Sequence, residues 1–201
     1  MTSEPTIVLA SGNQGKIREI NAVLASSGLV IVPQSDYKIS EVPETGLSFV
    51  ENALIKARHA SQHTGLAAIA DDSGLEVDAL KGAPGIYSSR YAGIHATGQQ
   101  NVEKLLTALF DVDEAARTAR FQCVIVYLRH AKDPTPIICS GTWEGRILET
   151  SLGHNGFGYD PVFYVPTHQC SAAELNSEVK NTLSHRAQAL QQLKLHFHQH
   201  S

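Results

Sequence analysis

Short apolar runs alternate with amphipathic stretches along the N-terminal part of this 201-residue chain. Residues 6–10 and 29–33 are dominated by apolar side chains over the length of a buried strand. Residues 17–24 lie between these runs and carry apolar side chains at the spacing of one helix face, and residues 47–57 repeat that spacing. The pattern predicts an α/β fold in which βαβ connections surround a central sheet.

The apolar run at residues 66–70 predicts a further buried strand, which is followed directly by Asp71, Asp72, Ser73 and Gly74. Because Asp, Ser and Gly are ordinary turn formers, we expect the strand to end there and to place both carboxylates at the edge of the sheet. Residues 75–80 alternate with period two and predict a strand returning from that turn. Two interpretations stay open: a solvated turn, or a divalent-metal site that relieves the repulsion between the acids.

The C-terminal part of the chain adds both strands and helices. Residues 121–128 show the strongest β pattern, and residues 137–147 predict its antiparallel partner, so the sheet should be mixed. Helical spacing appears at residues 102–109 and again at 187–197, where Ser184 is placed to cap the last helix.

Composition restricts the classes of function. The chain is 42% apolar, enough to bury a core, and its net charge of −4 without clustered Lys and Arg argues against a nucleic-acid-binding surface. Three cysteines without C-x-x-C spacing predict free thiols in a reducing compartment. The apolar runs are too short for a signal peptide or a membrane span, so we expect a soluble, cytoplasmic protein without a membrane partner. His196, His198 and His200 could bind a metal, although a solvated terminus is favoured.

A glycine-containing loop, residues 11–16, joins the first predicted strand to the first predicted helix. Backbone N–H groups at such a helix start can bind phosphate, and Lys16 adds a positive charge. The loop is not a Walker A motif, because its spacing is short and Ile17 stands where Ser or Thr would hold magnesium. A tight turn without a ligand is the alternative interpretation.

Two further segments could contact a nucleoside. Phe157 lies in a glycine-rich loop, where it could stack on a base or act as a hydrophobic anchor, with neither favoured. Lys180, His185 and Arg186 lie at or near the start of the last helix, where the His and Arg donors could bond a carbonyl on a base edge. A solvated helix end would explain the same residues.

Taken together, these segments resemble the inosine triphosphate pyrophosphatase family, whose members are also described as dITP/XTP pyrophosphatases. The matching motifs are S-G-N-Q-G-K at 11–16, E-T-G-L-S-F-V-E-N-A at 44–53, A-D-D-S-G-L-E-V-D at 70–78, G-A-P-G-I-Y-S-S-R-Y-A-G at 82–93, G-F-G-Y-D-P-V-F at 156–163 and S-H-R-A-Q-A-L at 184–190. The resemblance implies a single catalytic domain over residues 1–201. It implies an elongated, two-lobed α/β fold with a long central mixed sheet flanked by helices, an active site in the cleft between the lobes, and a homodimer.

The resemblance also implies Mg²⁺-dependent hydrolysis of ITP, dITP and XTP to the nucleoside monophosphate and pyrophosphate. It implies that Asp72 is the general base, that Asp71 and Lys16 assist it, and that Glu44 and Asp72 bind the metal. Phosphate contacts are implied for Ser11, Gly12, Asn13, Gln14, Gly15, Lys16 and Lys56. A contact with the substrate is implied for Ser73, and nucleoside contacts are implied for Phe157, Gly158, Tyr159, Asp160, Lys180, His185 and Arg186. The alternatives are a house-cleaning pyrophosphatase for other modified nucleotides, a phosphomonoesterase, and a nucleotide-binding module without catalysis, which does not require the acid cluster.

Overall fold

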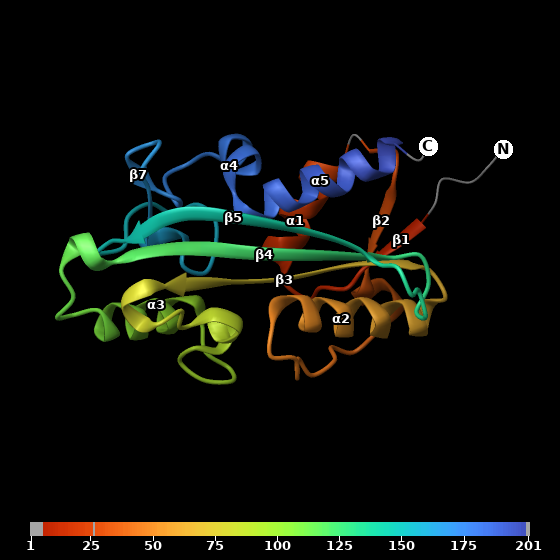
Figure 1. Ribbon diagram of the computed structural model, residues 1–201, viewed down its shortest axis with the longest axis horizontal. Coiled ribbons are helices and arrows are strands. Elements are labelled where there is room, and N and C mark those ends of the chain that lie inside the picture. The colour runs from red at the N-terminus through yellow and green to blue at the C-terminus, as the bar shows by residue number, and fades with distance from the viewer. Residues whose placement is uncertain (1–5, 26, 200–201) are drawn as a thin grey trace. The chain divides into compact units, whose positions relative to one another are not determined.

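The computed structural model describes residues 6–25 and 27–199 (Figure 1). The strands are β1 Thr6–Leu9, β2 Val30–Pro33, β3 Ala67–Val77, β4 Thr118–Leu128, β5 Ile137–Ile147, β6 Phe163–Val165 and β7 Cys170–Ser171. The α-helices are α1 Gln14–Leu24, α2 Phe49–Thr64, α3 Gly98–Ala108, α4 Ser177–Leu183 and α5 His185–Gln199. Short 3₁₀ helices are η1 Gln34–Tyr37, η2 Asp78–Leu80, η3 Gly85–Arg90, η4 Glu114–Ala116 and η5 Asp160–Val162. No helix within the described ranges is long and apolar enough to cross a membrane.

The strands form one seven-stranded sheet in the order β2-β1-β3-β4-β5-β6-β7. The strand β1 is parallel to both of its neighbours, with Ile7 opposite Ile31 of β2 and Ala67 of β3. The strand β6 is antiparallel to β5 and β7. The sheet is therefore mixed and flanked by helices, and the predicted α/β class is confirmed.

The prediction of a turn at the Asp pair is wrong, because β3 continues without interruption from Ala67 to Val77. Leu75 and Val77 are fully buried, so the apolar burial of the strand resumes beyond the acids. Turn preference is a weak tendency that burial and side-chain partners override. Here lysine and arginine side chains from other elements meet both carboxylates within the sheet. The acids therefore lie inside a strand and not at its end.

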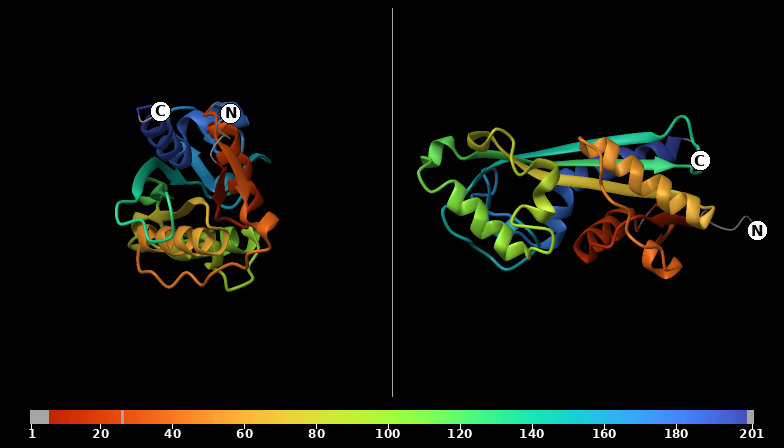
Figure 2. Two further views of the ribbon diagram at one scale, coloured as in Figure 1. Left: turned by 90° about the vertical axis from the view of Figure 1, so that its right-hand side faces the viewer. Right: turned by 90° about the horizontal axis from the view of Figure 1, so that it is seen from below.

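The chain forms two compact units, of which unit 1 comprises Met1–Asp72, Cys123–Gly141 and Arg186–Ser201. In unit 1, α2 covers one face of the strands, and α1 and α5 cover the other (Figures 1 and 2). Side chains alternate accordingly along β1, because Ile7 and Leu9 pack with α1 and α5, whereas Val8 packs on the alanines of α2. The alanines of α2 also pack with Ala68 and Ala70 of β3.

Unit 2 comprises Ser73–Gln122 and Thr142–His185 and has a core of its own. Its aromatic centre is Phe121, whose ring centroid lies 4.5 Å from that of Phe163 and 6.3 Å from that of Trp143. Leucines of α3 complete this core. Each unit therefore has a hydrophobic core that can support polar side chains at its own surface.

The last predicted helix is confirmed as α5, which begins at His185. Ser184 directly precedes it in an extended backbone conformation and is buried, and its capping of α5 stays a prediction. His196 and His198 lie in the last turn of α5, while His200 is outside the described residues.

Candidate active site

The predicted phosphate-binding loop joins β1 to α1, as the sequence indicated. Asn13 caps the helix, because its Oδ1 accepts a hydrogen bond from the Lys16 backbone N–H at 3.1 Å. The Asn13 backbone N–H in turn donates to Ser11 Oγ at 3.2 Å. The loop is thus held in shape by hydrogen bonds between its backbone and its own polar side chains. The loop is thereby held at the positive end of the helix dipole, with the backbone of Gln14 and Gly15 in the first turn.

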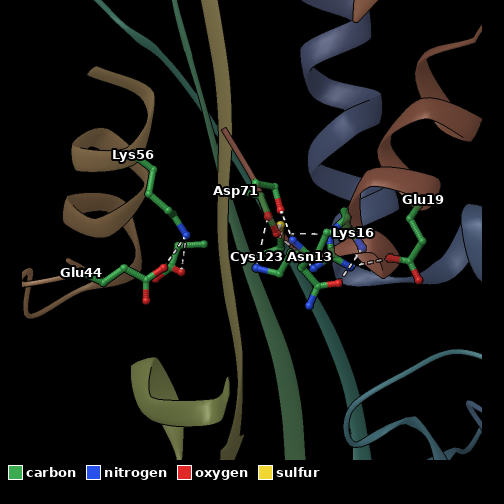
Figure 3. Close-up of polar contacts among 10 residues, drawn as sticks. Asn13, Lys16, Glu19, Glu44, Lys56, Asp71 and Cys123 are labelled. Carbon is green, nitrogen blue, oxygen red and sulfur yellow. Dashed lines mark hydrogen bonds and ion pairs between the residues drawn. The ribbon is translucent and has the colours of Figure 1, made fainter. Parts of the chain in front are cut away.

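The two adjacent acids point to opposite faces of β3, because successive residues of a strand alternate. Asp71 lies on the side of α1 and α5, as does Ile69, whereas Asp72 lies on the side of α2, as does Ala70. Figure 3 shows Lys56 on one side of β3 and Asp71 on the other. Asp71 and Asp72 are therefore adjacent in the sequence but contact different side chains.

Asp71 is buried among cations. Its carboxylate lies 3.2 Å from Lys16 Nζ, and its Oδ2 accepts from Arg186 Nη2 at 3.0 Å and from Arg186 Nε at 3.2 Å. Burial alone would raise the pKa of Asp71, but Lys16 and Arg186 outweigh it and hold the pKa well below the ordinary value. Arg186 also pairs with Glu19 of α1. A carboxylate held charged in this way anchors two cations and is a poor proton acceptor.

A cysteine thiol adjoins the same carboxylate. Cys123 Sγ lies 3.9 Å from Asp71 Oδ2, and burial together with Asp71 raises the pKa of the thiol to about 12. Cys123 is therefore a protonated thiol in this cluster, and it does not add a charge.

Asp72 shares one cation with a second acid. Lys56 Nζ lies 2.9 Å from Asp72 Oδ1 and 2.8 Å from Glu44 Oε1. Burial raises the pKa of Asp72, although the positive charge of Lys56 opposes it. The carboxylate that faces α2 is therefore the more basic of the two, which suits a group that accepts a proton from water.

The acids that face α2 fit a divalent cation. Asp72 Oδ2 is buried and has no hydrogen-bond partner among the described residues, so one of its lone pairs is available. Carboxylate oxygens are the ligands that Mg²⁺ prefers, and Glu44 supplies a second carboxylate on the same lysine. Within the described ranges no group of three His, Cys, Asp or Glu side chains is arranged to hold a metal. A cation here would complete its coordination with water and substrate oxygens, as Mg²⁺ commonly does.

Unit 2 holds a second polar cluster around Asp160. Asp160 Oδ2 accepts from the Phe157 backbone N–H at 2.7 Å and from Lys180 Nζ at 2.6 Å. Lys180 Nζ lies 5.1 Å from the centroid of the Phe157 ring. Gly156 has a φ of +74°, and a β-carbon there would collide with the Asp160 carboxylate, so this position requires glycine. Asp160 therefore sets the positions of both an aromatic ring and a cation.

The remaining predicted residues of unit 2 are placed beside its core. His185 stacks on Phe121 with ring centroids 4.7 Å apart and an interplanar angle of 12°. Tyr159 donates its hydroxyl hydrogen bond to Ser88 O at 2.8 Å and is buried, so its phenol is engaged within unit 2. Ser73 is half-buried next to Asp72 on β3.

The structure thus gathers the predicted phosphate and metal residues in unit 1 and most of the predicted nucleoside residues in unit 2. Arg186 differs from the expected grouping with His185, because its guanidinium bonds Asp71 and Glu19 within unit 1. Sequence reasoning overlooked Glu19, although it lies one helical turn after Lys16 and could have been found by that spacing. It also overlooked Asn52, a fully buried amide on α2.

A family model described as the Ham1 family matches residues 7–196. The chain belongs to the Ham1 family. Its resemblance to the dITP/XTP pyrophosphatases is confirmed, because the "dITP/XTP pyrophosphatase" of Vibrio vulnificus is 64% identical over 93% of this chain and 94% of its own length.

Among solved structures, the HAM1 protein of Coxiella burnetii has a TM-score of 0.90 at 50% identity, with 97% of this chain and 99% of that chain covered. The Ham1 protein of Staphylococcus aureus has a TM-score of 0.85 at 40% identity, with 98% and 100% covered. The Ham1 fold therefore extends over nearly the whole chain.

Proposed function

We propose that this Ham1 protein is a nucleoside triphosphate pyrophosphatase that hydrolyses ITP, dITP and XTP to the monophosphate and pyrophosphate, and so prevents incorporation of these nucleotides into DNA and RNA. The names of its relatives support this class of reaction. The observation that carries the proposal is the Asp72 carboxylate, which shares Lys56 with Glu44 and keeps an oxygen available. The proposal includes one catalytic domain over residues 1–201, a homodimer and a cytoplasmic location.

The phosphates are proposed to bind the loop between β1 and α1. Backbone N–H groups of Gln14 and Gly15 lie at the start of α1, and Asn13 fixes their direction by capping the helix. Lys16 and Lys56 supply positive charge, and each is already held by a carboxylate. These groups would stabilise the negative charge that develops on the departing pyrophosphate.

Mg²⁺, when bound by Glu44 and Asp72, supplies neutralisation of phosphate charge and polarisation of the phosphorus–oxygen bonds. Asp72 then accepts a proton from the attacking water as the general base. The water oxygen bonds the α-phosphorus as the bond from that phosphorus to the α–β bridging oxygen breaks. Asp71 keeps Lys16 and Arg186 in place during this step and takes no proton itself.

The base is proposed to bind the groups of unit 2. Phe157 offers a ring for stacking, and Lys180 and His185 offer hydrogen-bond donors. Hypoxanthine and xanthine present a 6-carbonyl to such donors, whereas the amino group of adenine would leave them unpaired. Arg186 is assigned first to Asp71, and any contact with the base would use its other N–H groups.

A panel of nucleoside triphosphates tests the proposal, with the purified protein, Mg²⁺ and separate measurement of pyrophosphate and orthophosphate. We expect pyrophosphate from ITP, dITP and XTP and far lower kcat/KM with ATP. Orthophosphate as the first product would instead indicate a phosphomonoesterase. Equal kcat/KM for ITP and ATP would refute the selection of the base by hydrogen-bond donors.

A further inference from the structure

Asn52 is a fully buried polar residue in the first turn of α2. Its Oδ1 accepts a hydrogen bond from the Gly46 backbone N–H at 2.8 Å. Its Nδ2 is buried and has no hydrogen-bond partner among the described residues. Reversing the amide would set its NH₂ group against the Gly46 N–H, so the bond to Gly46 fixes the orientation. The oxygen of Asn52 therefore has a defined partner, while its nitrogen remains unsatisfied.

The segment before α2 rests closely on the helix at this point. A β-carbon on Gly46 would lie 2.5 Å from Glu51 Cβ and 2.8 Å from Asn52 Oδ1, so only glycine fits. Glu51 Oε2 also accepts from the Leu47 backbone N–H at 2.9 Å and from Ser48 Oγ at 2.7 Å. Gly46, Leu47 and Ser48 are thus attached in succession to the first turn of α2. Of these three attachments, the hydrogen bond that Asn52 accepts is part-buried, whereas the two that Glu51 accepts are exposed.

The same helix also holds the nearby acid. Asn52 and Lys56 are four residues apart and therefore lie on one face of α2. Lys56 Nζ holds the Glu44 carboxylate at 2.8 Å and the Asp72 carboxylate at 2.9 Å. Glu44 is consequently fixed at its side chain by Lys56 and, two residues further along the backbone, by Asn52. The positive charge of Lys56 lies between these two acids and opposes their mutual repulsion.

We propose that Asn52 is a positioning residue that fixes the segment carrying Glu44, so that Glu44 and Asp72 present their carboxylates to one divalent cation. This inference rests on the proposed function, because it concerns the cation of the same reaction. A residue retained only for packing would be apolar here, since an amide with an unsatisfied buried NH₂ group is unfavourable. The acceptor for Gly46 is the property that leucine lacks.

The test replaces Asn52 by leucine, which keeps the approximate volume and removes the acceptor. Asn101 provides a matched control: it is buried in the first turn of α3, and its Oδ1 accepts from the Ala92 backbone N–H at 2.7 Å. Asn52→Leu and Asn101→Leu each remove a buried amide that ties a preceding segment to a helix. Asn101 belongs to unit 2, where its side chain bonds the backbone of Ala92 and of Ser89.

Two readouts separate positioning from general destabilisation. The first is Mg²⁺ affinity of the nucleotide-free protein, followed by calorimetry, and the second is the Mg²⁺ concentration that gives half-maximal ITP hydrolysis. We expect Asn52→Leu to weaken both by about 10–100-fold, the range for residues that orient metal ligands. Asn101→Leu should leave both unchanged while lowering Tm. Unchanged Mg²⁺ affinity in Asn52→Leu, or an equal loss in Asn101→Leu, overturns the proposal.

Two further variants complete the test. Gly46→Ala disturbs the same attachment from the loop side and should raise the Mg²⁺ requirement even if Asn52→Leu does not fold. In a Glu44→Gln background, Asn52→Leu should add no further loss of Mg²⁺ affinity, because its effect acts through Glu44. An equal effect in both backgrounds contradicts the inference. If the wild-type protein binds Mg²⁺ but releases no pyrophosphate, the proposed function fails while the nucleotide-free titration still tests Asn52.

Discussion

Replacing Asp71 and Asp72 individually by asparagine should separate stability from catalysis. Asp71 is buried against Lys16 and Arg186, and removing one partner of a buried ion pair costs about 3–5 kcal/mol. Lys16 retains 16% side-chain exposure and Arg186 keeps Glu19, so both cations stay partly compensated. We therefore expect Asp71→Asn to lower the free energy of unfolding by about 3 kcal/mol, the lower end of that range.

Asp72→Asn should change stability little and catalysis strongly. Burial raises the pKa of Asp72, which means that the folded protein disfavours its charged form. Lys56 keeps Glu44 as a partner when the Asp72 charge is removed. The free energy of unfolding should therefore change by less than about 1 kcal/mol, while kcat falls about 10²–10⁴-fold through loss of the general base.

The assay is urea unfolding followed by circular dichroism without Mg²⁺, together with kcat for ITP hydrolysis at saturating Mg²⁺. Because the pKa of Asp71 is lowered on folding, its contribution is present above the ordinary value of 3.8 and is lost as the pH falls below it. The stability difference between wild type and Asp71→Asn should thus be constant from about pH 8 to pH 5 and narrow below about pH 3.8. Equal destabilisation by the two substitutions, or wild-type stability of Asp71→Asn, would refute the assignment of separate roles.

Two other predictions concern unit 2 and the thiols. Asp160→Asn weakens the hydrogen bonds that position Lys180 and Phe157. In steady-state kinetics, KM for ITP should therefore rise about tenfold with a smaller change in kcat. An unchanged KM would contradict this prediction. Cys123 is buried, and its pKa is raised to about 12. In the native protein at pH 8, Cys123 should therefore resist a disulfide-exchange reagent that modifies the half-buried Cys170. Peptide mass spectrometry can identify the modified thiol, and rapid modification of Cys123 would argue against its burial.

The N-terminal half of unit 1 was predictable because its signals are local. The run at residues 6–10 ends in a loop whose Asn13 and Lys16 define the start of α1, so strand, loop and helix follow from short-range patterns. The apolar spacing at residues 47–57 likewise predicted α2, and the structure adds Ser48 as its N-cap and Gly65 as its C-cap.

The course of β3 could not be predicted, because its cause is distant in the sequence. Asp71 and Asp72 favour a turn by local preference, yet Lys16, Lys56 and Arg186 meet their charges within the sheet. Short elements were missed for a different reason. The strand β7 has only two residues, and the seven residues of α4 give less than two full repeats of a helical pattern.

Motifs identified the candidate site more completely than they identified its internal contacts. The spacing of residues 11–16 reveals the loop, but nothing local shows that Arg186 bonds Asp71 rather than grouping with His185. Asn52 carries no sequence signal of a role either, because asparagine within a helix is unremarkable until its burial is known. Long-range pairing and burial are the two quantities that a single sequence does not contain.

The alternation of β3 explains how two adjacent acids could serve one reaction in different ways. A strand separates neighbouring side chains onto opposite faces, so each carboxylate acquires its own set of cations and its own degree of burial. Lys16 and Arg186 lower the pKa of Asp71 against the effect of burial, while burial prevails over Lys56 at Asp72 and raises the pKa there. Environments that move two pKa values apart distinguish an anchoring carboxylate from a proton-accepting one. Exchanging the two roles would require exchanging the faces of the strand, which a shift of register by one residue would do at the expense of every apolar contact on both faces.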